Sequence, residues 1–356
     1  MDNKTRLRFE VLKTALAIAI ALVIVFVIIF FVSEQPGQAI VSMVIGPFTS
    51  LRRIGNVIEA MTPLIFTGLA VTMLYRTGLF NLSMEGGFFI ASVAATAAAV
   101  SFNLPPVLNV LVAFVVAALV GGVASLVPGV LKVKCHANEL VTSLMLNYVL
   151  LYLGLYIIIN FFHDPAMNAN YSFAFPENMQ LARIIPETRI NLGTIFAFIA
   201  VGFVYYLLNH TGFGYKITMV GKNSRMAAAA GINVGSTIIW SQLIGGMLAG
   251  VGGATELFGM YKRFQYQGLP GFGWDGVLIA IVAQFKPQLV PVSAFFLAYL
   301  RIGADIMSRE SDVPSEIITI IQAVIIVLIS AEAVLKRYQH NQIAKQARRE
   351  EALNNG

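Results

Sequence analysis

The sequence predicts an all-α protein, a polytopic transmembrane bundle of about ten spans in which some helices are interrupted. Composition is the first observation: 57% of the 356 residues are hydrophobic and 12% are charged, whereas soluble domains are about half apolar and about a quarter charged. The second is an uncharged apolar run at 15–32, which is followed by many similar runs. The third is the position of the basic residues, which gather at the ends of these runs.

Each expected span is an apolar run near the length of about 20 residues that crosses a bilayer. The first run stays apolar through Val32 and shows no small-residue cleavage site after a short core, so we expect a retained span and not a signal peptide. The eighth run is unusually short. The expected spans cover residues 15–32, 57–75, 79–100, 107–131, 140–162, 190–208, 236–261, 276–285, 289–307 and 317–335.

The basic residues predict the orientation. If the N-terminus is cytoplasmic, most of the 24 Lys and Arg lie in inner segments, and the positive-inside rule then places both termini in the cytoplasm. We expect a cytoplasmic N-terminus at 1–14, a transmembrane domain at 15–335 and a basic cytoplasmic tail at 336–356, which can also contact lipid headgroups. The net charge of +6 does not indicate a nucleic-acid partner, because the basic residues serve as topology signals.

The span expected at 79–100 begins with an interruption between Gly78 and Gly87. It places Asn81 and Glu85 at a depth that should be apolar, where polar and ionisable groups are costly and often functional. Adjacent glycines after the acid weaken the helix. Alternatively, Glu85 is a helix-end acid that accepts hydrogen bonds from free backbone amides.

A second interruption, at 268–276, precedes the short run and contains Trp274 and Asp275. Asp275 aligns with Glu85 at an offset of about half the chain. Interrupted segments at corresponding places in two halves point to a transport pathway, although Asp275 could also be a helix-end acid. Glycine pairs inside other spans, such as 121–122, indicate close helix packing instead.

The cytoplasmic connection 212–234 is expected to contain a short helix. Asn223 or Ser224 can cap a helix over 225–230, and Gly231 can end it. A short helix outside the bilayer with an alanine face and a basic flank suits docking to another protein. The alternative is an interfacial amphipathic turn.

The sequence contains no recognisable catalytic or metal-binding pattern. Cys135 is the single cysteine, and the four histidines lie in or near expected loops. A phosphate-binding loop would need glycine at the position of Lys216 and Ser or Thr at that of Asn223. We therefore expect no catalytic residue, no metal ligand and no ATP site in this chain.

Four stretches resemble a known family over residues 54–335. They are Gly68-Leu-Ala-Val with 76–86, then 138–148, then 220–233, and 270–276 followed by Lys286-Pro287. In them the chain resembles the membrane permease subunits of bacterial ABC importers, in the superfamily of branched-chain amino acid, ribose and nucleoside permeases. The stretch 138–148 is most similar to the nucleoside branch. Family members often have Gln and Phe where this chain has Gly87 and Trp274.

The resemblance implies a multi-pass permease subunit of the bacterial plasma membrane, surrounded by lipids, that is not itself an enzyme and binds no cofactor. A separate ABC ATPase would use ATP and Mg against the 212–234 segment. A second homologous permease would complete a heterodimeric pore, and a lipoprotein or periplasmic binding protein would deliver the substrate. The expected coupling residues are Gly221, Lys222, Asn223, Arg225, Ala228 and Gly231. The expected pathway residues are Asn81, Glu85, Asn147, Tyr148, Trp274 and Asp275.

A nucleoside is the expected cargo, because its flat, uncharged base and its ribose suit aromatic and weakly polar path residues. The same architecture could import a sugar or a branched-chain amino acid. Two other classes are less compatible with the sequence. An ion-coupled secondary transporter would need no coupling segment, and a membrane enzyme would need a catalytic cluster.

Overall fold

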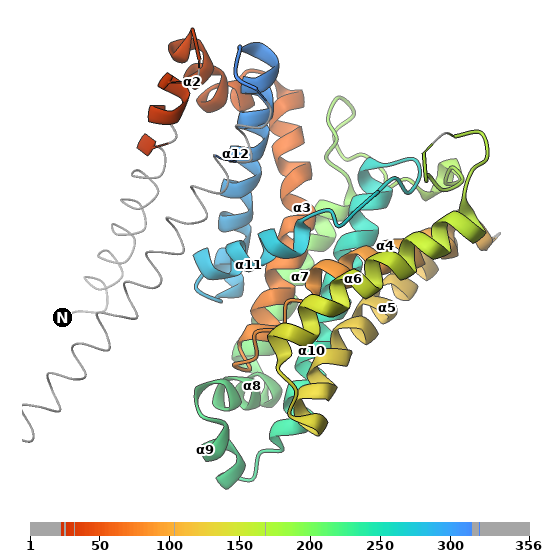
Figure 1. Ribbon diagram of the computed structural model, residues 1–356, viewed down its shortest axis with the longest axis vertical. Helices are drawn as coiled ribbons and strands as arrows, with labels where there is room; N and C mark the ends of the chain where they lie inside the picture. The colour runs from red at the N-terminus through yellow and green to blue at the C-terminus, as the bar shows by residue number, and fades with distance from the viewer. Residues whose placement is uncertain are drawn as a thin grey trace, which may run out of the picture. The chain divides into compact units, whose positions relative to one another are not determined.

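The structure is a computed structural model and describes residues 23–24, 26–31, 33–102, 104–167, 169–314 and 320. Apart from two isolated β-bridges in loops, the regular structure of these residues is helical (Figure 1). The chain divides into two units, one of residues 50–299 and one formed by residues 1–49 with 300–356. The predicted all-α class is confirmed for the described part of the chain.

Most helices belong to the larger unit, and α12 continues from it into the smaller one. Side chains of Ser50, Asn138, Asn191, Thr211 and Asn233 accept hydrogen bonds from first-turn amides and so define where five of the helices begin. The helices are α3 (Leu51–Tyr75), α4 (Met84–Ser101), α5 (Pro106–Cys135), α6 (Glu139–Ile157), η2 (Ile158–Phe162), η3 (Glu177–Met179), α7 (Leu192–His210), α8 (Gly212–Lys222), α9 (Ser224–Ala229), α10 (Val234–Met260), α11 (Phe272–Val282), η4 (Pro287–Leu289) and α12 (Val290–Glu310).

Seven helical segments of the described chain are long and apolar enough to cross a membrane. They match the predicted long runs between residues 57 and 307, and the short run predicted at 276–285 is the eleven-residue helix α11. The spans predicted at 15–32 and 317–335 lie mainly outside the described residues, and the terminal segments 1–14 and 336–356 lie wholly outside them. A total of about ten spans therefore stays a prediction.

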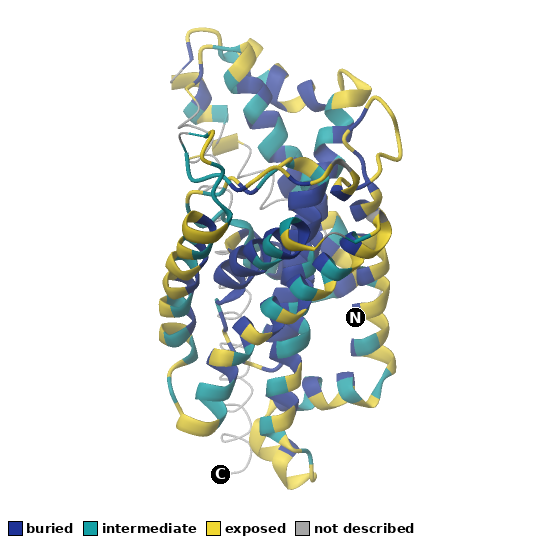
Figure 2. Ribbon diagram, turned by 90° about the vertical axis from the view of Figure 1, so that its right-hand side faces the viewer, coloured by how far each residue is buried: buried dark blue, intermediate teal, exposed yellow. Residues whose placement is uncertain are grey.

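Helix α10 is central to the larger unit and packs against α5, α3 and α4. Glycines bring the backbones of α5 and α10 into contact: a Cβ on Gly121 would lie 2.6 Å from the carbonyl oxygen of Gly246, and one on Gly250 would overlap the carbonyl of Ala117. This confirms that these glycines serve close helix packing. Figure 2 shows the buried residues in dark blue where the helices of this unit meet.

The smaller unit contains α2 (Pro36–Val44), η1 (Gly46–Phe48) and the last turns of α12. Asp312 joins these segments, because its carboxylate accepts hydrogen bonds from the Ser33 hydroxyl and the Glu34 amide, both at 2.6 Å. The two hydrogen bonds hold the pKa of Asp312 below its usual value.

Candidate functional site

The first interruption is the non-helical segment 78–83 between α3 and α4, and it is held by a buried amide cluster. The side-chain amide of Asn81 donates to Gln242 Oε1 at 2.7 Å and to the carbonyl of Ser125 at 3.2 Å. Its oxygen accepts from the amide of Ser83 at 2.9 Å. Asn81 thus joins the interruption to α5 and α10, and both of its side-chain polar atoms are used within the protein.

Helix α6 holds the other side of the same interruption. Asn147 accepts from the amide of Gly86 at 2.9 Å and donates to the carbonyl of Leu82 at 3.0 Å. Ser143 accepts from the amide of Leu82 at 3.0 Å. A Cβ on Gly86 would lie 2.8 Å from the Cα of Asn147, so only glycine fits this contact without displacement.

Glu85 joins the two interruptions. Its Oε1 accepts from the amide of Gly271 at 2.5 Å, and its Oε2 accepts from the amides of Gly273 at 2.6 Å and Trp274 at 3.4 Å. A carboxylate is favourable there because the first amides of α11 have no intrahelical partner. The two interruptions are therefore in direct contact, with Glu85 in the helix-end role. Their correspondence as parts of an internal repeat stays a prediction.

The loop that leads to the second interruption is anchored to the loop after α6. Arg263 and Asp164 form an ion pair at 2.9 Å. The amide of Phe264 donates to the Ser172 hydroxyl at 2.9 Å.

The six expected pathway residues fall into two groups. Asn81, Glu85, Asn147 and Asp275 are buried, and the first three use their polar atoms in the contacts above. Tyr148 and Trp274 are exposed. The sequence reasoning missed Ser125, Ser143 and Gln242, although polar residues inside apolar runs could have indicated them.

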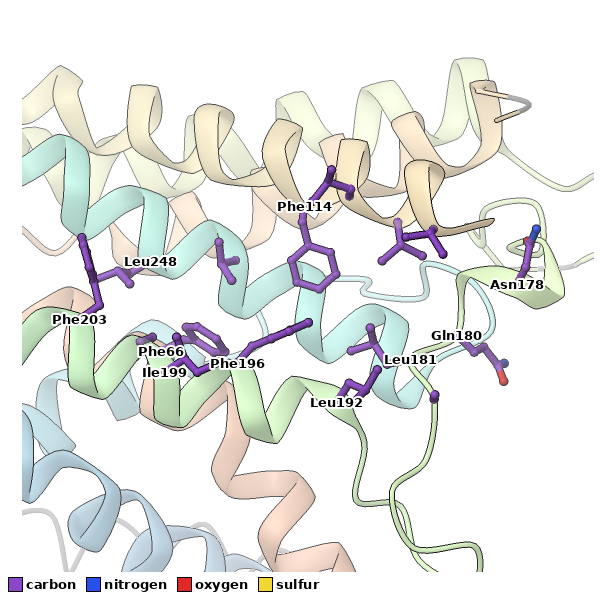
Figure 3. A pocket seen from close by; sticks show the side chains of 16 residues that line it. Phe66, Phe114, Asn178, Gln180, Leu181, Leu192, Phe196, Ile199, Phe203 and Leu248 are labelled. Atoms are coloured by element: carbon purple, nitrogen blue, oxygen red, sulfur yellow. The ribbon is translucent and has the colours of Figure 1, made fainter. Parts of the chain in front are cut away.

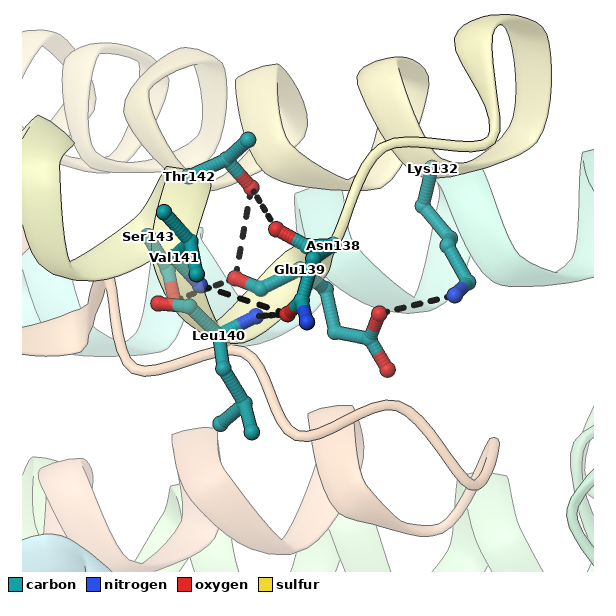
Figure 4. Close-up of polar contacts among 7 residues, drawn as sticks. All are labelled: Lys132, Asn138, Glu139, Leu140, Val141, Thr142 and Ser143. Atoms are coloured by element: carbon teal, nitrogen blue, oxygen red, sulfur yellow. Dashed lines mark hydrogen bonds and ion pairs between the residues drawn. The ribbon is translucent and has the colours of Figure 1, made fainter.

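The connection between α5 and α6 is polar and well defined (Figure 4). Lys132 and Glu139 form an ion pair at 2.8 Å. Asn138 caps α6 and accepts from the amides of Leu140 and Val141. Cys135, the last residue of α5, is exposed beside this connection.

The predicted short helix in the 212–234 segment is present as α9, capped by Asn223, whose oxygen accepts from the amides of Arg225 and Met226 at 3.1 Å. Gly231 follows it with φ +80°, a conformation that favours glycine. Figure 1 shows α8 and α9 together at one end of the larger unit. The helix α8 was not predicted, because its three glycines weaken the helical pattern.

The six expected coupling residues are exposed, while Ala227 on the opposite face of α9 is buried with Leu79, Val220 and Ile238. A Cβ on Gly221 would overlap the carbonyl oxygen of Arg76, at the start of the first interruption. The end of α8 is therefore in backbone contact with the segment that leads to Asn81 and Glu85.

An apolar cavity of about 710 Å³ lies between α5, α7 and α10 (Figure 3). Phe114, Phe196 and Leu248 are among its lining residues, and Asn178 and Gln180 are the polar residues of the lining. None of the expected pathway residues lines it. Within the described residues, no group of three His, Cys, Asp or Glu could hold a metal ion.

The family described as the branched-chain amino acid transport system permease component matches residues 53–330. The chain belongs to this permease family. The resemblance found in the sequence is thereby confirmed, and a permease component is a transport subunit and not an enzyme.

Several relatives match this permease over most of their length. The guanosine ABC transporter permease NupP of Bacillus subtilis is 32% identical over 294 residues, covering 82% of this permease and 84% of the relative. The nucleoside ABC transporter permease NupB of Lactococcus lactis is 27% identical, covering 94% of each chain. The glucose ABC transporter permease TsgB13 of Haloferax volcanii is 29% identical, covering 86% of this permease and 84% of the relative.

Proposed function

We propose that this permease is the membrane-spanning subunit of an ABC importer for nucleosides. The observation that carries the proposal is the similarity to the guanosine and nucleoside permeases, which extends over most of both chains. The match to a glucose permease favours a sugar as the second candidate cargo. A leucine-type cargo has weaker support, because an amino acid brings two charges and the described polar groups are largely used within the protein.

The subunit would sit in the bacterial plasma membrane with both termini cytoplasmic. The end of the larger unit that holds α8 and α9 supports this orientation, since Lys132, Lys134, Lys222 and Arg225 belong to segments that meet there. The exposed face of α9 would dock on a separate ABC ATPase that uses ATP and Mg. A second permease, in a heterodimer, would close the pore, and a binding lipoprotein or periplasmic protein would deliver the nucleoside.

The site geometry supports two different roles for the expected pathway residues. Asn81, Glu85 and Asn147 shape the pathway by holding the interruptions, whereas Tyr148 and Trp274 face it. Backbone contact between Gly221 and Arg76 gives ATPase-driven movement of α8 and α9 a direct route to the first interruption.

Uptake measurements test the cargo. Radiolabelled guanosine, uridine, glucose, ribose and leucine are offered to a strain that lacks this gene and to the same strain with the gene restored. We expect loss and recovery of guanosine and uridine uptake only. Loss and recovery of sugar or leucine uptake, with both nucleosides unaffected, would overturn the nucleoside assignment and leave family membership standing.

A further inference from the structure

Helix α6 presents a line of tyrosines that the described chain leaves largely exposed, although the ring of Tyr156 meets the ring of Phe161 edge-on. Tyr148, Tyr152 and Tyr156 follow one another at four-residue spacing and are between 56% and 68% exposed. The opposite face of α6 packs against α4 through Asn147 and Gly154. In the described part of the chain, no residue forms a hydrogen bond with the three tyrosine hydroxyls.

The depth of these tyrosines in the membrane is unusual. The candidate span Glu139–Phe162 contains 24 residues, and at about 1.5 Å per residue Tyr148 and Tyr152 lie roughly 13 and 20 Å from its start, near its middle. Tyrosines at membrane interfaces form aromatic belts, which accounts for Tyr156 near the far end and not for the other two. A hydroxyl in hydrocarbon without a partner is costly.

Other helices of the same chain show what its mid-depth exposed faces otherwise contain. On α5, Val115, Leu119 and Val123 have the same four-residue spacing and are between 50% and 58% exposed, and all three are aliphatic. The exposed tyrosines of α7, Tyr205 and Tyr206, lie in the last turns of that helix, as in an aromatic belt. The tyrosine face of α6 and the aliphatic face of α5 are therefore similarly exposed, but only the face of α6 carries hydroxyl groups.

We propose that the tyrosine face of α6, formed by Tyr148, Tyr152 and Tyr156, lines the water-filled translocation path and stacks on the base of the passing nucleoside. The inference rests on the proposed nucleoside function and adds two residues to Tyr148. Aromatic rings stack on any base, because every base has a π-face. The hydroxyls can form hydrogen bonds with water and with ribose. The successive tyrosines would therefore provide a series of low-affinity binding positions across the middle of the membrane.

Cysteine accessibility tests the location of this face. Cys135 is the single cysteine, so Cys135→Ser gives a background for Tyr148→Cys and Tyr152→Cys, with Val115→Cys and Leu119→Cys as matched controls on α5. The assembled importer in membrane vesicles is treated with a charged, water-soluble methanethiosulfonate. We expect the α6 cysteines to react at least about tenfold faster than the α5 cysteines, and guanosine to slow their labelling.

The outcomes separate this inference from the proposed function. Equally slow labelling on both helices would place the face in lipid and overturn the inference. Cross-linking of α6 cysteines to a second permease without reagent labelling would make it a dry subunit interface, which also overturns it. Fast labelling that glucose slows and guanosine does not would uphold the path and overturn the nucleoside cargo.

Nucleoside uptake by two variants of Tyr152 then tests the aromatic ring and the hydroxyl group separately. Tyr152→Leu removes the ring, and we expect nucleoside uptake at limiting substrate to fall at least about fivefold, the lower end of what one base–aromatic stack contributes. Tyr152→Phe keeps the ring and should retain most of the uptake. Tyr206→Leu on α7 is the matched control and should transport normally. Normal uptake by Tyr152→Leu at wild-type membrane abundance would overturn the stacking role.

Discussion

At the scale of single residues, Glu85 has the most consequential contacts in the larger unit. Both carboxylate oxygens accept backbone amides of the second interruption, and the residue is 1% exposed. A side chain with only one acceptor oxygen cannot reproduce this arrangement. The amide group of a glutamine would face an amide donor of the α11 N-terminus.

We expect Glu85→Gln to lower the free energy of unfolding by about 2 kcal/mol, the range of a lost hydrogen bond to a charged group. Thermal unfolding of the solubilised importer measures the change. Glu187→Gln is a matched control, because Glu187 is exposed in a loop and such substitutions usually stay within about 0.5 kcal/mol. An unchanged melting temperature for Glu85→Gln would show that the contact does not hold the two interruptions together.

At the scale of elements, α9 depends on its two ends. Asn223 provides the N-terminal cap, and Gly231 has φ +80° immediately after the helix. We predict that Gly231→Val abolishes transport and ATPase docking, because a β-branched residue cannot adopt this conformation without strain. Co-purification of the ATPase measures docking.

The control for this substitution is Gly212→Ala in the same segment, where an added Cβ would meet nothing within 4 Å. It should transport and dock as the wild type does. Substrate capture by the binding protein should be unaffected in both variants. Wild-type uptake by Gly231→Val would remove α9 from the coupling role.

The elements differ in how far the sequence could predict them. The spans between residues 57 and 307 were predictable, because an apolar run of sufficient length has few other solutions. Helix α9 was predictable from its cap and its terminal glycine. Helix α8 was not predictable, since Gly212, Gly214 and Gly221 lower its helical propensity. Gly221 is nevertheless needed at the end of α8, because a side chain there would overlap the carbonyl oxygen of Arg76.

The sequence could predict which residues belong to the candidate site better than it could predict their hydrogen-bond partners. Polar residues at apolar depth identified Asn81 and Glu85, whereas Asn147 was identified through the resemblance over 138–148. Their partners come from distant helices, as Gln242 does for Asn81, and no local pattern encodes such a pairing. The tyrosine face of α6 could be recognised only once the structure showed which face of each helix is exposed, and sequence periodicity alone does not provide this information.

At the scale of the whole molecule, the positive-inside rule makes a prediction about the connection between α5 and α6. Cys135 is exposed there, and Lys132 and Lys134 lie in the last turn of α5. Basic residues near span ends remain on the cytoplasmic side, so Cys135 should face the cytoplasm. The adjacent ion pair of Lys132 with Glu139 does not cover it, because the cysteine itself remains exposed.

A membrane-impermeant maleimide applied to intact cells and to inverted membrane vesicles tests this orientation. We expect Cys135 to be labelled in inverted vesicles and to stay unlabelled in intact cells, with Cys135→Ser as the control for background labelling. Efficient labelling in intact cells would invert the topology. It would also place α8 and α9, which pack near the same end of the larger unit, on the side away from any cytoplasmic ATPase. The labelling of Cys135 therefore tests the orientation of the chain and, with it, whether α9 lies on the side where it could reach a cytoplasmic ATPase.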